Sequence, residues 1–276
     1  MGRHTIIINQ SHYKGNGLFR YDMPVGATFK DAKLSMYQVA MYNSTFNITA
    51  FYGNNTLSIK WIDNTVVNLT IPDGYYSYND INNFIQNACL ANNWYVSPAS
   101  NTSSAIYFIT CSANSARYAA NMNVYAVPTA ASASGVYTKP SGATWAWPSS
   151  PTTPQITLSS GLGKIFGFTN LVMPPSVQSS NFSAVSNIVP VISPVYSYLV
   201  SCNLLNSNFS LQNQLFFQIP INAPFGGLII VNNPQSQLLD IQDGYYKSID
   251  LFFSDQNGNV LNLLDTEVTI ILLLDN

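Results

Sequence analysis

The C-terminal stretch constrains the fold of this chain more than any other part of the sequence. Ile249–Ser254 (IDLFFS) is followed by residues 255–258 (DQNG) and then by Val260–Leu264 (VLNLL). Asn257 and Gly258 both tolerate the positive φ angles of a type I′ turn, so this pattern predicts a β-hairpin.

The last apolar run, Val268–Leu274 (VTIILLL), is β-rich and contains no polar residue except Thr269. This pattern predicts a strand that is covered on both faces, since a buried helix would be expected to run longer. Such a strand completes the core only when it pairs with strands that are distant in sequence. The stretch therefore favours a sandwich or a barrel.

Several earlier segments have the short, alternating character of strands and are separated by turn residues. This spacing is typical of a sandwich. The segments are residues 18–21, 32–43, 47–52, 56–61, 66–71, 105–111, 122–127, 196–205, 214–219 and 228–231.

One amphipathic helix is expected among these strands. Ser77, with Asp80 three residues later, resembles a capping box. Apolar residues then recur with helical spacing on one face, at Ile81, Phe84, Ile85 and Ala88. The helix is expected to pack against a sheet or over the end of a sandwich.

The region 129–154 is rich in Ala, Ser, Thr, Pro and Gly and carries Trp145 and Trp147. It predicts a long loop that is ordered only where these tryptophans find a surface to bury against. The glycine-rich segment 161–168 (GLGKIFGF) lacks the pattern of a phosphate-binding loop. It predicts a turn with a buried pair, Phe166 and Phe168.

Charged residues make up 8% of the chain, about a third of the ~25% that is usual in soluble domains. An isolated monomer with so few charges has weak self-repulsion, and such a surface suits burial against identical neighbours. The net charge of −2 provides no basic field, so direct binding to nucleic acid is not expected. No apolar stretch is long enough to predict a membrane span.

No catalytic, cofactor-binding or metal-binding residues are expected. Cys89, Cys111 and Cys202 are widely spaced and odd in number, which predicts free, buried thiols in a reducing compartment. His4 and His12 lack nearby clusters of metal-binding residues and lie in residues 1–16, which are expected to form a mobile arm. No nucleophile or metalloprotease motif is present, so an enzyme is not expected.

Eight segments follow one another along most of the chain, from about Gly17 to Leu274. They are LFRYDMP, LSMYQVAMYNSTFNI, IPDGYYSYNDINNFIQ, WAWPSSP, FGF, YLVSCNLLN, FFQIPINAPFG and IDLFFSDQNGNVLNLLD. In these motifs and their order the chain resembles the penton (minor capsid) proteins of virophages and polinton-type viruses. The resemblance carries over no catalytic residue.

The resemblance implies an all-β fold, with a single jelly-roll sandwich and an inserted second β-rich domain that faces outward. It implies an arm over residues 1–16, a jelly roll over 17–71 plus 195–276, and an insertion over 72–194. The implied protein is a homopentamer at the vertex of an icosahedral capsid, in contact with itself and with the major capsid protein. It would be made in the host cytoplasm and found in the virion.

One alternative function remains open from the sequence. A virion spike or a carbohydrate-binding jelly roll for host attachment could use exposed tyrosines and tryptophans of the loops to stack on sugar rings.

Overall fold

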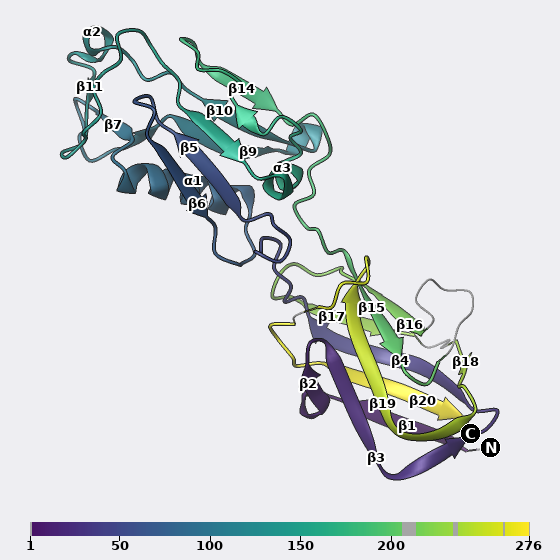
Figure 1. Ribbon diagram of the computed structural model, residues 1–276. Helices are drawn as coiled ribbons and strands as arrows, with labels where there is room; N and C mark the ends of the chain where they lie inside the picture. Colours follow the sequence, from purple (N-terminus) through teal and green to yellow (C-terminus); the bar gives the residue numbers. More distant parts are fainter. Residues whose placement is uncertain (1, 206–213, 234–236, 262, 276) are drawn as a thin grey trace. The chain divides into compact units, whose positions relative to one another are not determined.

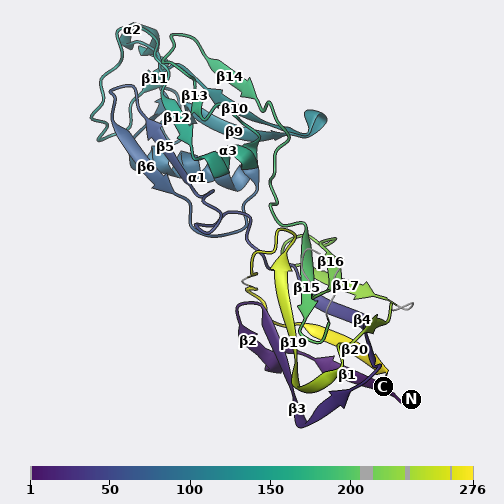
Figure 2. The same cartoon turned by 45° about the vertical axis from the view of Figure 1, so that its right-hand side comes forward.

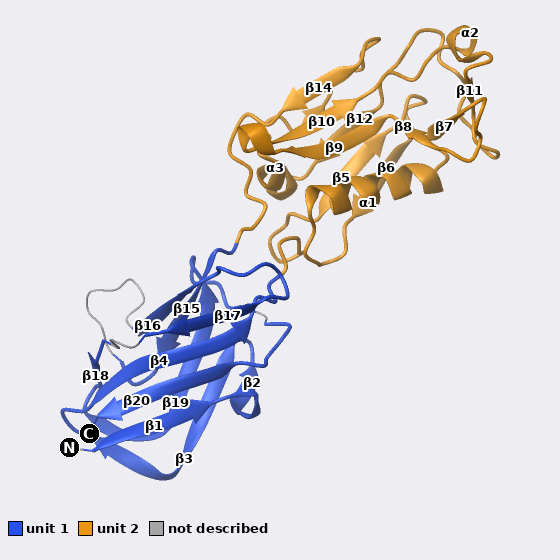
Figure 3. Ribbon diagram, turned by 180° about the vertical axis from the view of Figure 1, so that it is seen from behind, with its two compact units in different colours: residues 1–45, 195–276 blue, residues 46–194 orange. Residues whose placement is uncertain are grey.

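The computed structural model describes residues 2–205, 214–233, 237–261 and 263–275. The chain divides into two compact units (Figure 3). Unit 1 comprises Met1–Thr45 and Val195–Asn276, and unit 2 comprises Phe46–Pro194. Unit 2 is therefore an insertion between two segments of unit 1.

Unit 1 consists almost entirely of strands. They are β1 (Arg3–Ile8), β2 (Tyr13–Gly15), β3 (Leu18–Phe29), β4 (Lys33–Tyr42), β15 (Ser197–Cys202), β16 (Leu215–Pro220), β17 (Leu228–Asn232), β18 (Leu239–Asp240), β19 (Gly244–Asp255) and β20 (Thr269–Asp275), with a short 3-10 helix, η1 (Gln10–His12), after β1.

These strands form two antiparallel sheets (Figure 1). One has the order β1-β20-β4-β17, with β18 also paired to β4, and the other has the order β16-β15-β19-β3-β2. In a jelly roll, the strands lettered B to I in chain order form one sheet BIDG and a second sheet CHEF. Lettering β1, β3, β4, β15, β16, β17, β19 and β20 as B to I reproduces both sheets, so unit 1 is a jelly roll.

The core of unit 1 lies between the BIDG and CHEF sheets, where alternate residues of each strand point inward. In β20, Ile270 and Leu272 are buried whereas Ile271 and Leu273 are only partly covered. The expectation that this strand is covered on both faces is therefore wrong for the single chain. The strand lies in the middle of its sheet, between β1 and β4, but only one sheet face packs against the other sheet.

The predicted hairpin turn is present, with a different geometry. Positive φ is confined to Gly258, and the amide of Gly258 donates to the carbonyl of Asp255 at 3.0 Å. The Asp255 side chain accepts hydrogen bonds from the Asn257 and Asn259 amides, which favours this turn over a type I′ turn. Beyond the turn, Val260 makes only an isolated bridge to Ser254, and residue 262 lies outside the described residues.

The mobile arm expected over residues 1–16 is wrong for the described part of that segment. Arg3–Ile8 is strand β1, which pairs with β20 so that Ile7 lies opposite Ile271. Ile8 is fully buried in the core of unit 1. The short apolar run at the N-terminus thus supplies the edge strand beside β20.

Unit 2 has its own sheets and helices (Figure 2). Its elements are β5 (Thr56–Lys60), β6 (Val66–Thr70), α1 (Tyr78–Ala91), β7 (Tyr95–Pro98), β8 (Ile106–Tyr107), β9 (Ile109–Asn114), η2 (Ser115–Arg117), β10 (Ala119–Val124), α2 (Ala130–Ala133), β11 (Tyr137–Thr138), β12 (Gln155–Leu158), α3 (Ser160–Phe166), β13 (Val172–Met173) and β14 (Phe182–Val185). The sheet orders are β13-β12-β5-β6, β14-β10-β9 and β11-β7-β8.

The first boundary of the insertion differs from the expectation. Strands β5 and β6 were assigned to the jelly roll, over residues 17–71, but β5 pairs with β12 of unit 2. The insertion therefore begins at Phe46 rather than at Pro72, because a strand belongs to the sheet that holds its hydrogen-bond partners.

Helix α1 confirms the local prediction. Ser77 accepts from the Asp80 amide, and the Asp80 side chain accepts from the Ser77 amide, which is the predicted capping box. Ile81, Ile85 and Cys89 form its buried face. A further short helix, α3 (Ser160–Phe166), replaces most of the turn predicted over residues 161–168. Phe166 and Phe168 are buried as expected, and their rings stack with centroids 6.5 Å apart.

The tryptophans of unit 2 bury against one another. Trp61 stacks on Trp94 with ring centroids 5.5 Å apart, and Trp145 meets Trp61 edge to face at 5.5 Å. The indole Nε1 of Trp145 donates to the carbonyl of Asn93 at 2.6 Å. The loop that carries Trp145 and Trp147 is thus held by the core of unit 2 itself.

Candidate functional site

Reactive side chains do not gather in the parts of the chain that the structure describes. Across those residues, no group of three or more His, Cys, Asp or Glu side chains is placed to hold a metal ion. Cys89, Cys111 and Cys202 are free and buried, as predicted. Burial raises the pKa of each thiol to about 12, so the thiols are protonated at neutral pH.

Both histidines lie in the first fifteen residues, but they belong to different secondary-structure elements. His4 lies on β1, and His12 closes the capping box of η1, where its Nδ1 accepts from the Asn9 amide at 3.2 Å. No helix within the described residues is long and apolar enough to cross a membrane.

Arg20 and Asp250 form an ion pair in unit 1 that links two neighbouring strands. The Arg20 guanidinium donates two hydrogen bonds to the Asp250 carboxylate, at 2.9 and 2.7 Å, across strands β3 and β19. These bonds hold the pKa of Asp250 below its ordinary value. The Asp250 amide also donates to the Asn203 side chain, so the pair fixes the end of β15 to β19.

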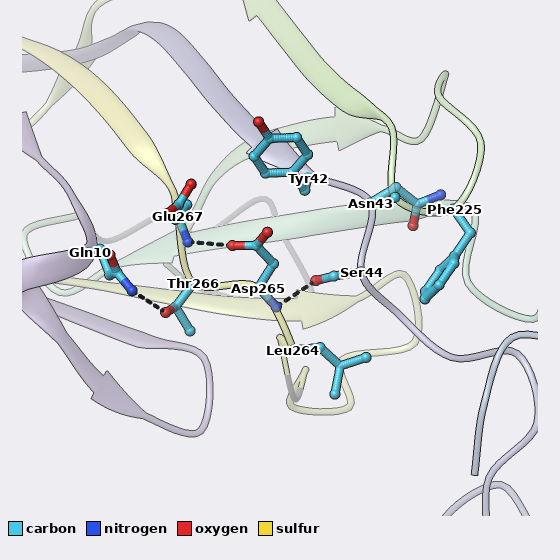
Figure 4. A pocket seen from close by; sticks show the side chains of 10 residues that line it. Gln10, Tyr42, Asn43, Ser44, Phe225, Leu264, Asp265, Thr266 and Glu267 are labelled. Carbon is cyan, nitrogen blue, oxygen red and sulfur yellow. Dashed lines mark hydrogen bonds between the residues drawn. The ribbon is translucent and has the colours of Figure 1, made fainter. Parts of the chain in front are cut away.

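Two adjacent hollows lie at one end of the BIDG sheet. The first, called here the end pocket, has a volume of about 520 Å³ (Figure 4). Its lining residues come from four separate segments and are Gln10, Tyr42, Asn43, Ser44, Phe225, Gly226, Leu264, Asp265, Thr266 and Glu267.

Hydrogen bonds hold the wall of the end pocket in place. Asp265 accepts from the Glu267 amide at 2.8 Å, and its own amide donates to Ser44 Oγ at 3.1 Å. Gln10 reaches Thr266 Oγ1 at 3.2 Å. The lining provides two carboxylates, amides, hydroxyls and apolar groups, and it contains no histidine, cysteine, lysine or arginine.

The second hollow, called here the face pocket, opens on the outer face of the BIDG sheet and has a volume of about 530 Å³. It shares Gln10, Tyr42 and Glu267 with the end pocket. Its remaining lining residues are Asn9, Ser11, Ala40, Leu228, Val268 and Thr269. Both pockets combine polar and apolar side chains, and such a lining suits contact with another protein surface.

Both outer faces of the jelly roll expose large apolar side chains. On the BIDG sheet, Ile7, Leu228 and Ile230 are 52%, 47% and 48% exposed, and on the CHEF sheet Phe252 is 41% exposed. An antiparallel sheet with one solvated face normally places polar residues there. These faces are therefore the candidate functional surfaces of unit 1, suited to contacts with other proteins.

These surfaces are not predicted above, where apolar strand residues are interpreted only as core. The signal was nevertheless present, since consecutive apolar residues in LIIV (228–231) and LFF (251–253) must place side chains on both faces of a strand.

No protein-family model and no curated protein sequence matches this chain. Among solved structures, the crystal structure of the mavirus penton protein is similar over 100% of this chain and 99% of its own, with a TM-score of 0.44 and 9% identity. The Sputnik virophage structure is similar over 99% of this chain and 97% of its own, with a TM-score of 0.43 and 13% identity.

One of these neighbours is a penton protein and the other comes from a virophage, the group that the sequence resembles. Because both TM-scores and both sequence identities are low, these similarities do not by themselves support a conclusion about this chain. The jelly-roll fold is established here by the strand order of the two sheets.

Proposed function

We propose that this protein is a structural capsid protein, the penton subunit that forms the homopentameric vertex capsomer of an icosahedral capsid. The observation that carries the proposal is a jelly roll whose two outer faces both expose large apolar side chains. A unit with two different contact faces can bind one neighbour with each face, and such heterologous contacts form a ring when their rotation closes.

The composition supports the same proposal. Interfaces are poor in Lys, Glu and Asp and rich in aromatic residues. This chain has 8% charged and 13% aromatic residues. The resemblance to virophage penton proteins supplies the fivefold vertex as the specific assembly.

Unit 2 is proposed to be the outward-facing domain. It holds a continuous core of its own, with Trp61, Ile85 and Phe166 among the buried residues. A domain with an independent core can be inserted into a wall-forming unit without sharing that unit's core. The proposed partners are other copies of the chain and the major capsid protein around the vertex, in virions assembled from protein made in the host cytoplasm.

The alternative role as a spike or carbohydrate-binding module gains no support from the tryptophans. Trp61, Trp94 and Trp145 are buried, and Trp147 is partly buried in the same core. The three buried indoles therefore present no free ring face of the kind that stacks on sugars.

Electron microscopy of the purified full-length protein tests the proposal, alone and mixed with the major capsid protein. Class averages with fivefold rings are expected. A protein that stays monomeric in both samples, at the highest concentration it tolerates, would contradict the penton assignment.

A further inference from the structure

Phe252 is a large apolar side chain on the outer CHEF face. It is 41% exposed although it lies within the long strand β19, between the buried residues Leu251 and Phe253. Its neighbours across the sheet are Leu18 on β3 and Ser201 on β15. Because one neighbour is small, the phenyl ring stands above the surface around it.

The outer BIDG face carries the face pocket, which is compared here with the Phe252 ring on the outer CHEF face. Ala40 on β4 lies between Ile230 on β17 and Thr269 on β20 in the sheet register, and Ala40 and Thr269 both line the face pocket. The hollow arises because small side chains form its floor, while Tyr42 and Leu228 form part of its wall.

The ring and the hollow lie at the same level along the strands. Tyr198 on the CHEF sheet and Asn43 after β4 join the two sheets through a 3.1 Å hydrogen bond between Oη and Oδ1. Ala40 lies three residues from Asn43 along β4, and Phe252 lies three residues from Asp255, which is opposite Tyr198. At ~3.4 Å per residue, each feature is about 10 Å from this bond.

We propose that Phe252 of one copy packs into the face pocket of a second copy, so that the outer CHEF face of each jelly roll covers the outer BIDG face of the next. This inference rests on the proposed function, in which copies of the chain form a ring. Because ring and hollow lie at one level, the contact adds little translation along the strands. A heterologous contact forms a ring when its rotation closes, and a small translation adds little pitch to that rotation.

Three basic side chains on the two faces form ion pairs within the chain. On the BIDG face, Arg3 pairs with Asp275 at 2.8 Å and Lys33 with Asp240 at 3.5 Å, while Arg20 pairs with Asp250 at 2.7 Å on the CHEF face. These basic side chains already have partners within the chain. Packing one face on the other therefore leaves none of the three without a counter-charge.

The size of the faces also fits. Four strands spaced ~4.8 Å apart and about six residues long present roughly 400 Å² of sheet. A stable protein complex buries about 800 Å² on each partner, so the sheet supplies about half. The proposed contact therefore also requires the loops around the face pocket and the end pocket.

The test uses two full-length variants, each with one blocked face. Leu228→Lys blocks the face pocket, and Phe252→Lys removes the ring. Each variant alone is expected to associate at least tenfold more weakly than the wild type in sedimentation. Val66→Lys, at a residue that is 53% exposed on β6 of unit 2, is the matched control and is expected to assemble normally. Unchanged thermal melts establish that the variants fold.

A mixture of the two variants distinguishes this contact from a symmetric one. Each variant retains the face that the other lacks, so a one-to-one dimer without rings is expected in the mixture. If Phe252→Lys still assembles while Leu228→Lys does not, two BIDG faces meet each other and the proposal is wrong.

A covalent readout confirms the geometry. The double variant Ser201→Cys with Thr269→Cys places a thiol beside Phe252 and a thiol beside Ala40 while it keeps the ring and the hollow. With a bifunctional thiol reagent that spans about 10 Å, the spacing of packed sheets, it is expected to give covalent rings of five chains, and either single variant is expected to give none. Wild-type rings that persist in both lysine variants would overturn this contact but leave the penton function standing. Wild-type protein that forms no ring, alone or with the major capsid protein, would overturn the proposed function itself.

Discussion

The side-chain amide of Asn47 donates a hydrogen bond of 2.9 Å to the carbonyl of Ile192, across 145 residues of sequence. It thereby joins the segment by which the chain passes into unit 2 to the segment by which it leaves. Asn47 is buried and also exchanges hydrogen bonds with the backbone of Tyr76, at 2.8 Å in each direction. Unit 2 therefore closes its own two ends.

Asn47→Ala is expected to destabilise unit 2 by about 1–3 kcal/mol, because three backbone groups in part-buried hydrogen bonds lose their partner. Urea unfolding followed by tryptophan fluorescence reports on unit 2, since Trp61, Trp94, Trp145 and Trp147 all lie there. Asn79→Ala, at an exposed position of α1, is the control and should change the free energy of unfolding little. An equal effect of both substitutions would mean that Asn47 does not hold the ends together.

Ser35→Ala is expected to leave the stability of unit 1 unchanged or to raise it by up to about 1 kcal/mol. The Ser35 hydroxyl is buried on β4 without a hydrogen-bond partner, and removing an unsatisfied polar group removes its desolvation penalty. Ser44→Ala is the matched control, because Ser44 Oγ accepts from the Asp265 amide and its loss should cost about 1 kcal/mol. Thermal denaturation of the two variants compares them directly, and a marked loss at Ser35 would contradict the prediction.

Leu272→Asp should prevent folding of unit 1 or cost several kcal/mol, because it places a carboxylate in the core between the sheets. Leu273→Asp, one residue further on the outer face, should leave the fold intact and affect assembly only. Circular dichroism and sedimentation separate the two outcomes. Soluble, normally folded Leu272→Asp protein would refute the position of β20 in the core.

Deletion of residues 1–8 is expected to destabilise unit 1, because β20 loses its partner β1 and Ile8 leaves the core. The measurement is the midpoint of chemical unfolding compared with that of the full chain. An unchanged midpoint would show that β1 contributes nothing to the stability of the jelly roll.

The three cysteines should resist alkylation at pH 8 until the protein unfolds. Their pKa values are raised by burial from 9.0 to about 12. Because the folded protein holds these protons more tightly, the associated stability is present below about pH 9 and is lost as the pH rises toward 12. Mass spectrometry after iodoacetamide treatment checks the first point, and Phe252→Cys serves as an exposed, reactive control. Rapid labelling of the native wild type would contradict the burial.

The elements that were predicted correctly are those whose signals are local. Helix α1 needs only Ser77, Asp80 and an apolar stripe within fourteen residues, because its hydrogen bonds connect residues a few positions apart. The burial of Phe166 and Phe168 and the strand character of residues 268–274 likewise follow from short patterns.

The sequence by itself therefore determined an all-β chain with one capped helix, free buried thiols and a surface poor in charge. Only the tertiary structure decided that Arg3–Ile8 is a strand beside β20, that β5 and β6 belong to the insertion, and that Phe252 points away from the core. The reason is physical. A strand satisfies its backbone hydrogen bonds with partners that may lie anywhere in the chain, as Ile7 does with Ile271, and its pattern does not record which sheet or which face those partners select.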